Sequence, residues 1–335
     1  MADNIDCVAG VLAQDVTDRW AVYNGDCIDI LGMLPDNSIH GSIYSPPFSG
    51  LYQYSSSDRD LSNNRTYDEF FDHYGYVIRE KLRVTMPGRM TGVHAAPVPT
   101  GNTGGGRDGL LDFPGDVIRA HQKAGWIWVA RHAIWKEPLA VRNRTMQKNL
   151  SHKTICDNAA NGGVASADEL LIFRKPGESK LISHPCGLTN GYAGSEPIPA
   201  ELLRFRGMDG DQKTNRYSHH IWRRYASSVW DDVRLERVLP FRDAKDEDDE
   251  KHIHPLQLDV IERFLDLRTL PGEKVLTPFM GVGSEVYAAV QMGRFAIGAE
   301  LKPSYFQQAL RNLAAVDAER RVDDDALFDA AEVTA

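Results

Sequence analysis

The sequence predicts an α/β protein with a doubly wound, Rossmann-like, mostly parallel sheet, and two stretches carry this prediction. Residues 274–279 form a strand candidate that runs into a glycine turn, then a helical stretch at 285–292, then a second strand candidate at 295–299 that delivers Glu300. Strand, glycine turn, helix, strand and acid, with the acid about 20 residues after the turn, form the first half of a nucleotide-binding unit. The other stretch, residues 39–44, is a short apolar strand candidate that stops at two prolines.

The two stretches are expected to meet in space. After Glu300 only 35 residues remain, mostly a predicted helix at 304–316 and an acidic tail, which are too few to complete a sheet. The missing strands must therefore come from the N-terminal half. If the strand containing Leu276 lies beside the strand containing Ile43, their following turns share one crevice at the carboxyl ends of adjacent strands.

The elements between these stretches follow from local patterns. Strands are predicted at 20–23, 90–95, 126–135 and 168–175, and helices at 67–84 and 115–124. Residues 28–34 have helical spacing, whereas residues 1–19 show no strong pattern. A further helix opens after His254, with Ile261, Phe264 and Leu265 on its apolar face.

Composition places the chain among ordinary globular proteins. It has 335 residues, 42% hydrophobic and 25% charged, enough for one large α/β domain with a smaller region. No run approaches the ~18 apolar residues of a membrane span, and residues 1–4 lack the start of a signal peptide. The four cysteines have no metal-ligand spacing, so we expect reduced intracellular thiols and no metal site.

The net charge of −9 opposes a nucleic-acid partner, but its distribution does not. The acidic excess is concentrated at 246–250 and in the tail after Asp317. Residues 202–224 instead carry a local charge of +4 and mix arginines with aromatic side chains. A face that contacts DNA phosphates and bases is compatible with this segment, although an ordinary amphipathic helix around Trp222 explains the same pattern.

The sequence Ser45-Pro46-Pro47-Phe48 suits a planar group that bears an amine. Proline fixes φ and has no N–H, so the Ser45 hydroxyl and the Pro46 carbonyl can accept the two amine hydrogens while Phe48 stacks on the ring. Two acceptors that pull an exocyclic amine towards tetrahedral geometry localise its lone pair for attack on an electrophilic methyl group. The alternative is a Pro-Pro turn that merely closes a strand.

Three motifs together resemble the amino-methylating DNA methyltransferases, in the permuted (β-class) order in which the catalytic motif precedes the cofactor motif. They are the Ser-Pro-Pro-Phe motif at 45–48, His-Pro-Leu-Gln at 254–257 and Pro-Phe-Met-Gly-Val-Gly-Ser at 278–284. The resemblance covers roughly residues 20–313. It implies the methyltransferase fold, S-adenosyl-L-methionine as methyl donor, and DNA as substrate with a cytosine or adenine flipped out of the duplex.

The resemblance also divides the chain. It implies an N-terminal lead-in (1–19), a catalytic half (20–180), a target-recognition region (181–251), a cofactor-binding half (252–316) and an acidic tail (317–335). Catalytic roles fall on Ser45, Pro46, Pro47 and Phe48. Cofactor contacts fall on Asp26, Cys27, His254, Pro255, Gln257, Thr277, Pro278, Phe279, Met280, Gly281, Gly283, Ser284 and Glu300.

Several of these residues have plainer interpretations. Asp26 suits a helix N-cap equally well, and His254 suits a capping or core position. The chain also departs from the family pattern, because Leu258-Asp259 stands where Lys-Pro is usual and Thr277 stands where an acid is usual. DNA contacts are expected from basic side chains in loops and in the target-recognition region, namely Arg59, Arg144, Arg206, Arg216, Arg223 and Arg224.

Serine rather than aspartate stands at position 45, and the resemblance associates serine here with N4 of cytosine, with N6 of adenine as the alternative. Expected partners are DNA, a second copy of the chain in a homodimer and a cognate restriction nuclease, with no membrane. The resemblance implies the cytoplasm of a prokaryotic or phage-infected cell and association with the nucleoid. A nicotinamide dehydrogenase would explain 281–300 but not Ser-Pro-Pro-Phe, and an inactive DNA-binding module would explain only the arginine-aromatic segment.

Overall fold

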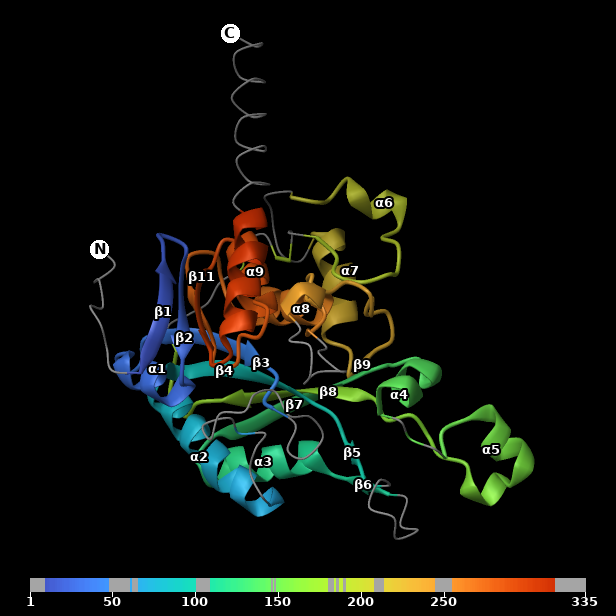
Figure 1. The fold of residues 1–335 in the computed structure, drawn as a ribbon. Helices are drawn as coiled ribbons and strands as arrows, with labels where there is room; N and C mark the ends of the chain where they lie inside the picture. The colour runs from blue at the N-terminus through green and yellow to red at the C-terminus, as the bar shows by residue number, and fades with distance from the viewer. Residues whose placement is uncertain are drawn as a thin grey trace.

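The computed structural model describes residues 10–47, 61, 66–100, 109–145, 147, 149–179, 184, 187–188, 191–207, 214–244 and 255–316. Its centre is a nine-stranded sheet with the order β1-β2-β11-β10-β3-β4-β8-β7-β9 (Figure 1). The strands are β1 (Val11–Val16), β2 (Trp20–Gly25), β3 (Ile39–Tyr44), β4 (Thr85–Ala95), β7 (Ile127–Ile134), β8 (Asp168–Arg174), β9 (Val229–Trp230), β10 (Lys274–Thr277) and β11 (Phe295–Glu300). A separate two-stranded sheet joins β5 (Val98–Pro99) and β6 (Leu110–Leu111).

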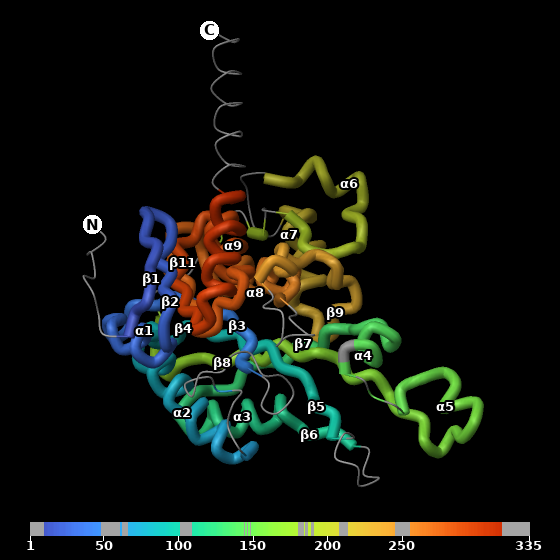
Figure 2. Tube along the Cα trace, viewed as in Figure 1, coloured from blue at the N-terminus to red at the C-terminus, as the bar shows by residue number. Residues whose placement is uncertain are grey.

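Helices cover both faces of the large sheet, as a doubly wound fold requires. α1 (Cys27–Met33), α2 (Tyr67–Val84) and α3 (Phe113–Lys123) pack on one face around Ile30, Phe70, Val77 and Phe113. α8 (Leu258–Arg268), α9 (Ser284–Gln291) and a helix at 303–316 pack on the other around Phe264, Val286 and Phe306. Figure 2 shows the two layers on either side of the strands.

The strand β10 lies beside β3, as the sequence predicts. β10 pairs in parallel with both β3 and β11, with Leu276 opposite Ser42 and Ile297. β11 pairs in parallel with β2, so the N-terminal half supplies the strands that the C-terminal unit lacks. β4 is also parallel to β3. The carboxyl ends of β2, β11, β10, β3 and β4 therefore lie along one edge of the sheet, called the carboxyl edge below.

The N-terminal segment contains a strand that was not predicted from the sequence. The lead-in at 1–19 has no strong pattern, yet Val11–Val16 forms the edge strand β1, antiparallel to β2. Six residues with a half-exposed face give too little periodicity to identify a strand, and Leu12 is 72% exposed. Pairing with β2, a strand buried along its whole length, is what fixes β1.

The region that follows β8 contains short helices rather than strands of the main layer. α6 (Ala200–Leu203) and α7 (Arg216–Tyr225) pack on each other around Tyr217, Ile221 and Tyr225 and lead into the short edge strand β9. Between β7 and β8, α4 (Pro138–Thr145), α5 (His152–Asp157) and a 3₁₀ turn project from the body (Figure 1). A further 3₁₀ turn, Arg242–Ala244, precedes α8.

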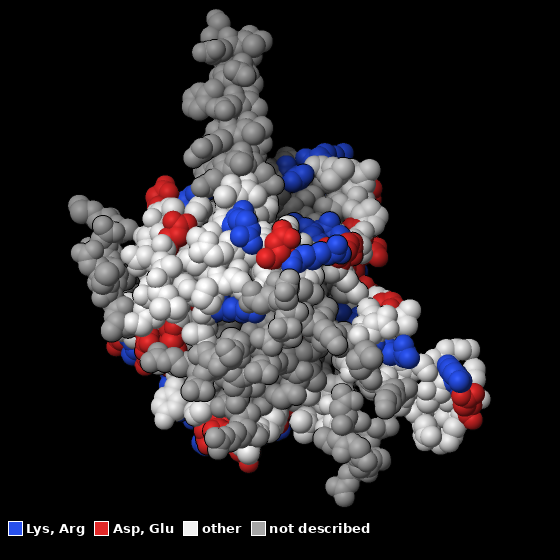
Figure 3. Space-filling view, in the orientation of Figure 1, with Lys and Arg blue, Asp and Glu red and all other residues white. Residues whose placement is uncertain are grey.

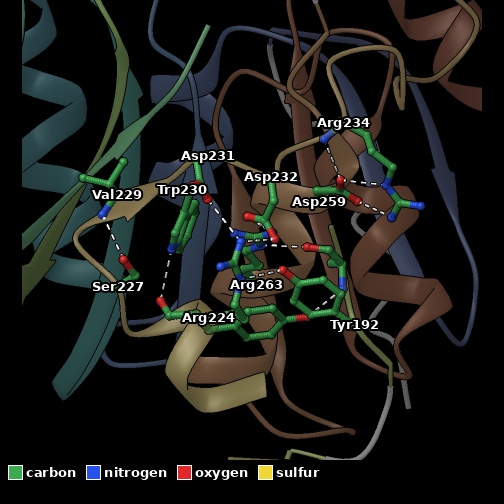
Figure 4. A network of polar contacts seen from close by, with 12 residues as sticks. Tyr192, Arg224, Ser227, Val229, Trp230, Asp231, Asp232, Arg234, Asp259 and Arg263 are labelled. Carbon is green, nitrogen blue, oxygen red and sulfur yellow. Dashed lines mark hydrogen bonds and ion pairs between the residues drawn. The ribbon is translucent and has the colours of Figure 1, made fainter. Parts of the chain in front are cut away.

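A buried arginine fastens α7 to α8. Arg263 is fully buried, donates to Asp232 at 2.9 Å and to the Ala193 carbonyl at 2.7 Å, and lies against the rings of Tyr225 and Trp230 (Figure 4). Removing the partners of a buried arginine would cost several kcal/mol. These contacts hold α7 and the segment around it against α8, the helix that follows the His-Pro-Leu-Gln motif.

Within the described residues, none of the helices combines the length and the apolar character needed to cross a membrane.

Candidate active site

The two motif turns are neighbours on the carboxyl edge. Ser45, Pro46 and Pro47 follow β3, and the glycine turn, residues 278–284, follows β10 directly beside it. The ring of Tyr44, the last residue of β3, packs on the ring of Phe279 with centroids 5.7 Å apart. The crevice expected from the sequence therefore has both of its turns in the predicted place. Phe48 lies outside the described residues.

The backbone of the glycine turn is held by Glu300. The Gly281 N–H donates to Glu300 Oε2 at 2.7 Å, and the Lys302 N–H donates to Oε1 at 2.8 Å. Gly281 and Gly283 adopt positive φ, +54° and +91°, which side-chain-bearing residues seldom tolerate. A Cβ on Gly283 would also lie 3.1 Å from Ala309. Both glycines are therefore required by the turn itself.

Close packing beneath the turn explains a third glycine. A Cβ on Gly298 of β11 would lie 2.6 Å from the sulfur of Met280 and 2.9 Å from Val286. The absence of a Cβ at Gly298 allows the glycine turn and α9 to pack closely against the sheet. The Met280 N–H donates to the Ala299 carbonyl at 2.8 Å, so the turn is joined to the end of β11, where Glu300 stands.

The polar groups of this turn fit a nucleoside-bearing cofactor. Thr277 and Ser284 are 1% and 2% exposed, and their hydroxyl oxygens have no hydrogen-bond partner among the described residues. A buried hydroxyl without a partner is costly and indicates a ligand or water at that point. A carboxylate oxygen can accept more than one hydrogen bond, so Glu300 can hold the backbone of the turn and a ribose hydroxyl together.

Asp26 and Cys27 lie at the start of α1, near the same end of the sheet. Asp26 is the N-cap of α1 and accepts from the Ile28 N–H at 2.8 Å, which confirms the capping interpretation and leaves the cofactor contact a proposal. Burial, and then the carboxylates of Asp26 and Glu300, raise the pKa of the Cys27 thiol, so it stays neutral. Asn24, which was not predicted from the sequence, donates to the carbonyls of Glu300 at 2.8 Å and Leu301 at 3.1 Å.

Opposite the glycine turn, Ser45 begins a chain of polar side chains. Its hydroxyl lies 2.9 Å from His94 Nδ1, and His94 Nε2 lies 3.2 Å from Asp168 Oδ2. A carboxylate only accepts hydrogen bonds, so His94 Nε2 carries the hydrogen and donates to Asp168. In the neutral imidazole, Nδ1 then accepts the hydrogen of the Ser45 hydroxyl. The serine oxygen can in turn accept a hydrogen from a further donor.

The series of polar contacts continues from Asp168 to the start of α8. Lys136 Nζ lies 3.1 Å from Asp168 Oδ2 and donates to Gln257 Oε1 at 3.1 Å. Asp168 is 1% exposed and Lys136 is 7% exposed, so both charges are buried and compensate each other. Gln257 is the N-cap of α8 and belongs to the His-Pro-Leu-Gln motif. We call Ser45, His94, Asp168 and Lys136 the relay.

Three of the four relay residues were not predicted from the sequence, although a signal for them exists. His94 lies near the end of a predicted strand, Asp168 starts one, and Lys136 follows one. The carboxyl ends of β4 and β7 and the amino end of the antiparallel β8 lie together on the carboxyl edge. Polar residues at strand ends become neighbours once the strand order is known, and the sequence does not supply that order.

The residues expected to contact DNA divide into two groups. Arg206, Arg216 and Arg223 are exposed on α7 and the turn after α6, beside Trp222, which is 57% exposed. Arg224 is instead half-buried and pairs with Asp232 at 3.0 Å and Asp231 at 3.1 Å (Figure 4). Arg59 lies outside the described residues, and the Arg144 side chain is not described. The surface over α6, α7 and α8 mixes positive and negative side chains (Figure 3).

Among the other residues predicted to contact the cofactor, Pro255 and Gln257 are half-buried just before α8, Pro278 and Met280 are buried in the glycine turn, and Phe279 is half-buried. His254 lies outside the described residues. The structure thus brings together the glycine turn, Glu300 and Ser45, and links Gln257 to them through the relay.

Comparison with known proteins identifies the family. The model of the N6/N4 DNA methylase family matches residues 39–311. The chain is 24% identical over 300 residues to the type II methyltransferase M.BglII of Bacillus subtilis, covering 88% of this chain and 68% of the relative. It is 23% identical over 289 residues to M.BamHI of Bacillus amyloliquefaciens, covering 85% of this chain and 55% of that relative.

Solved structures agree on the fold. TTHA0409 of Thermus thermophilus, solved in complex with S-adenosyl-L-methionine, has a TM-score of 0.59 at 21% identity, over 90% of this chain and 94% of that one. The PvuII DNA methyltransferase, described as cytosine-N4-specific, has a TM-score of 0.56 at 15% identity, over 89% and 87%. With the family model and the glycine turn, these findings establish that the chain belongs to the N6/N4 family of S-adenosyl-L-methionine-dependent DNA methyltransferases.

Proposed function

We propose that this protein methylates N4 of a cytosine that is flipped out of duplex DNA. The observation that carries the proposal is the position of Ser45: it follows β3 beside the glycine turn, and its hydroxyl is committed to His94. The serine oxygen is therefore an acceptor for the amine of the base. A neutral hydroxyl in place of a carboxylate is the feature that the resemblance associates with cytosine.

The role of the turn at 45–47 is to shape the amine. One amine hydrogen is directed to the Ser45 oxygen and the other to the Pro46 carbonyl, so the nitrogen lone pair is less delocalised into the ring. Pro47 keeps the turn rigid, because its φ is fixed and its nitrogen donates no hydrogen bond. Phe48 is proposed to stack on the base.

The glycine turn is proposed to hold the cofactor, which supplies an electrophilic methyl group. Glu300 would accept from the ribose hydroxyls, while the buried hydroxyls of Thr277 and Ser284 offer unsatisfied partners. Asp26, Cys27, Pro255 and Gln257 would line the remaining surface, and His254 is included through its motif. Thr277 replaces the usual acid of the family, so this chain binds the cofactor without that negative charge.

DNA contact is proposed for the exposed face of α7 and the segment before it. Arg216 and Arg223 are exposed on the helix, and Arg206 follows α6. Phosphate pairing by these arginines and stacking on Trp222 would position the duplex. Arg224 is proposed to act indirectly, because its ion pairs with Asp231 and Asp232 support the loop after α7.

The direct test is to identify the methylated nucleoside. Purified protein is incubated with mixed unmethylated genomic DNA and methyl-labelled S-adenosyl-L-methionine, and the DNA is digested and analysed by mass spectrometry. The proposal predicts N4-methyl-2′-deoxycytidine. N6-methyl-2′-deoxyadenosine would assign the alternative base, and the Ser45→Ala variant controls for a contaminating enzyme.

A further inference from the structure

We infer that the relay accepts the proton that methylation releases, through Ser45 and His94, and that Asp168 and Lys136 set the pH at which it does so. This inference rests on the proposed function but concerns a separate step. An exocyclic amine that gains a methyl group becomes an ammonium and must lose one proton before the neutral product is released. The structure offers a chain of groups at the position where that proton appears.

The geometry supports a proton path of two steps. The Ser45 oxygen is 2.9 Å from His94 Nδ1, which is within the range of a direct hydrogen bond. His94 is 7% exposed, so bulk water does not surround its ring. Because Asp168 fixes the hydrogen on Nε2, Nδ1 is the basic nitrogen and faces Ser45. This is the arrangement that a general base requires.

The step balances without a further reactant. The amine nitrogen attacks the methyl carbon, an N–C bond forms, and the S–C bond breaks with its electron pair left on sulfur. As the N–C bond forms, the developing ammonium gives one proton to the Ser45 oxygen while the serine hydroxyl proton moves to His94 Nδ1. The imidazolium is then stabilised by the Asp168 carboxylate and later loses its proton to water.

Among the described residues, Asp168 and Lys136 act on His94 with opposite charges. Asp168, at the start of β8, favours the protonated ring at 3.2 Å, whereas Lys136, after β7, lies 3.1 Å from the same carboxylate oxygen and disfavours it. The Ser45 hydroxyl lies beside Nδ1, on the other side of the ring from Asp168. Lys136 also donates to Gln257 at the N-terminus of α8, so the relay touches the segment proposed to hold the cofactor.

The inference is tested by pH profiles of single-turnover methyl transfer with cofactor-saturated enzyme and DNA. His94 must be neutral to accept the proton, so the wild-type rate rises with pH on the acidic side. His94→Gln is expected to lower the rate about a hundredfold and to abolish its rise with pH on the acidic side, with cofactor affinity unchanged. His132→Gln is the matched control, because His132 is also a buried ring of this sheet but bonds the Ser227 carbonyl outside the relay.

Two further variants distinguish a proton acceptor from a merely structural group. Asp168→Asn removes a negative charge and should move the half-maximal pH down, whereas Lys136→Met removes a positive charge and should move it up. Thermal melting checks that each variant folds. Opposite shifts support the relay.

The inference is overturned if His94→Gln keeps the wild-type pH profile, or if the two charge variants leave the half-maximal pH unmoved or shift it in the same direction. A wild-type protein that transfers no methyl group to DNA would instead refute the proposed function itself, so the two failures are distinguishable.

Discussion

The glycine turn follows β10 and the relay begins after the neighbouring strand β3, yet the two are built in different ways. The turn is a run of consecutive residues whose polar contacts are made by backbone N–H groups and by Glu300, about 20 residues further along. The relay takes one side chain from each of four places along the chain, Ser45, His94, Lys136 and Asp168. The turn is thus local in sequence, whereas the relay exists only in the folded sheet.

This difference predicts different consequences of substitution. Substitutions in the glycine turn should weaken cofactor binding or lower the stability of the fold, because the contacts of the turn are made by its backbone groups. Changes in the relay should alter the rate and its pH dependence while the cofactor still binds.

The largest effect is expected from a buried acid beside the turn. Burial, and to a lesser extent Glu300, raises the pKa of Glu285 to about 8 from its ordinary value of 4.5. Between these two pKa values the folded state binds more protons than the unfolded state. The free energy of unfolding therefore falls as the pH rises from about 4.5 to about 8. Glu285→Gln does not titrate. Its unfolding free energy should match wild type near pH 4.5 and exceed it above pH 8, by about 5 kcal/mol at most.

Denaturant unfolding at pH 5, 7 and 9 measures this difference. A gap between wild type and Glu285→Gln that stays constant with pH would show that the folded protein leaves Glu285 ionised. Glu236→Gln, the same substitution at an exposed glutamate, is the matched control.

Next in size is the loss of the acceptor for the amine. Ser45→Ala should lower single-turnover methyl transfer about a thousandfold, because one pre-organised polar group at the reacting centre is lost. Its affinity for S-adenosyl-L-methionine, measured by calorimetry, should stay at the wild-type value. Ser228→Ala, at an exposed serine before β9, serves as control. Weakened cofactor binding in Ser45→Ala would mean that the glycine turn and the relay do not act independently.

Glu300→Ala should show the reverse pattern. The Gly281 and Lys302 N–H groups lose their acceptor, and the proposed ribose contact is lost with them. Calorimetry should show cofactor affinity about a hundredfold lower, since a hydrogen bond to a charged group contributes about 1.5–3 kcal/mol. With saturating cofactor, most of the rate should return. A normal affinity in this variant would remove Glu300 from the cofactor site.

The smallest effect concerns DNA. Arg216→Gln together with Arg223→Gln should weaken DNA binding about tenfold at moderate salt and reduce the slope of log K against log salt by about 2, because two phosphate contacts are lost. Arg79→Gln with Lys123→Gln removes the same charge from exposed positions on α2 and α3 and should change little. Fluorescence anisotropy over a salt series measures both. Equal losses in the two double variants would indicate a general charge effect.

The same contrast explains what could be predicted from the sequence. The glycine turn, Glu300 and the neighbouring strands 39–44 and 274–277 were predictable, because periodicity, glycine and proline act over short distances. The pairing of β3 with β10 followed from the shortage of strands after Glu300. β1 was missed, because its half-exposed pattern is weak and β2 determines its pairing.

His94, Lys136 and Asp168 could not be predicted as a group. Their contacts depend on the order β3-β4-β8-β7, in which β8 runs antiparallel to both of its neighbours. An antiparallel strand brings its first residue, Asp168, to the edge where the parallel strands end. Nothing in the local sequence of Asp168 signals that reversal.

The methyl group of the cofactor and Ser45, the proposed hydrogen-bond acceptor for the amine, are proposed to lie close together at the carboxyl edge of the sheet. Every role assigned above depends on this proximity. A crystal structure of the protein with S-adenosyl-L-methionine tests it most directly. We predict the ribose on Glu300 and the methyl carbon facing Ser45 at about 6 Å from its oxygen, since an amine nitrogen between them would lie about 3 Å from each. A cofactor bound elsewhere, or with its methyl group turned away from Ser45, would contradict the proposed chemistry.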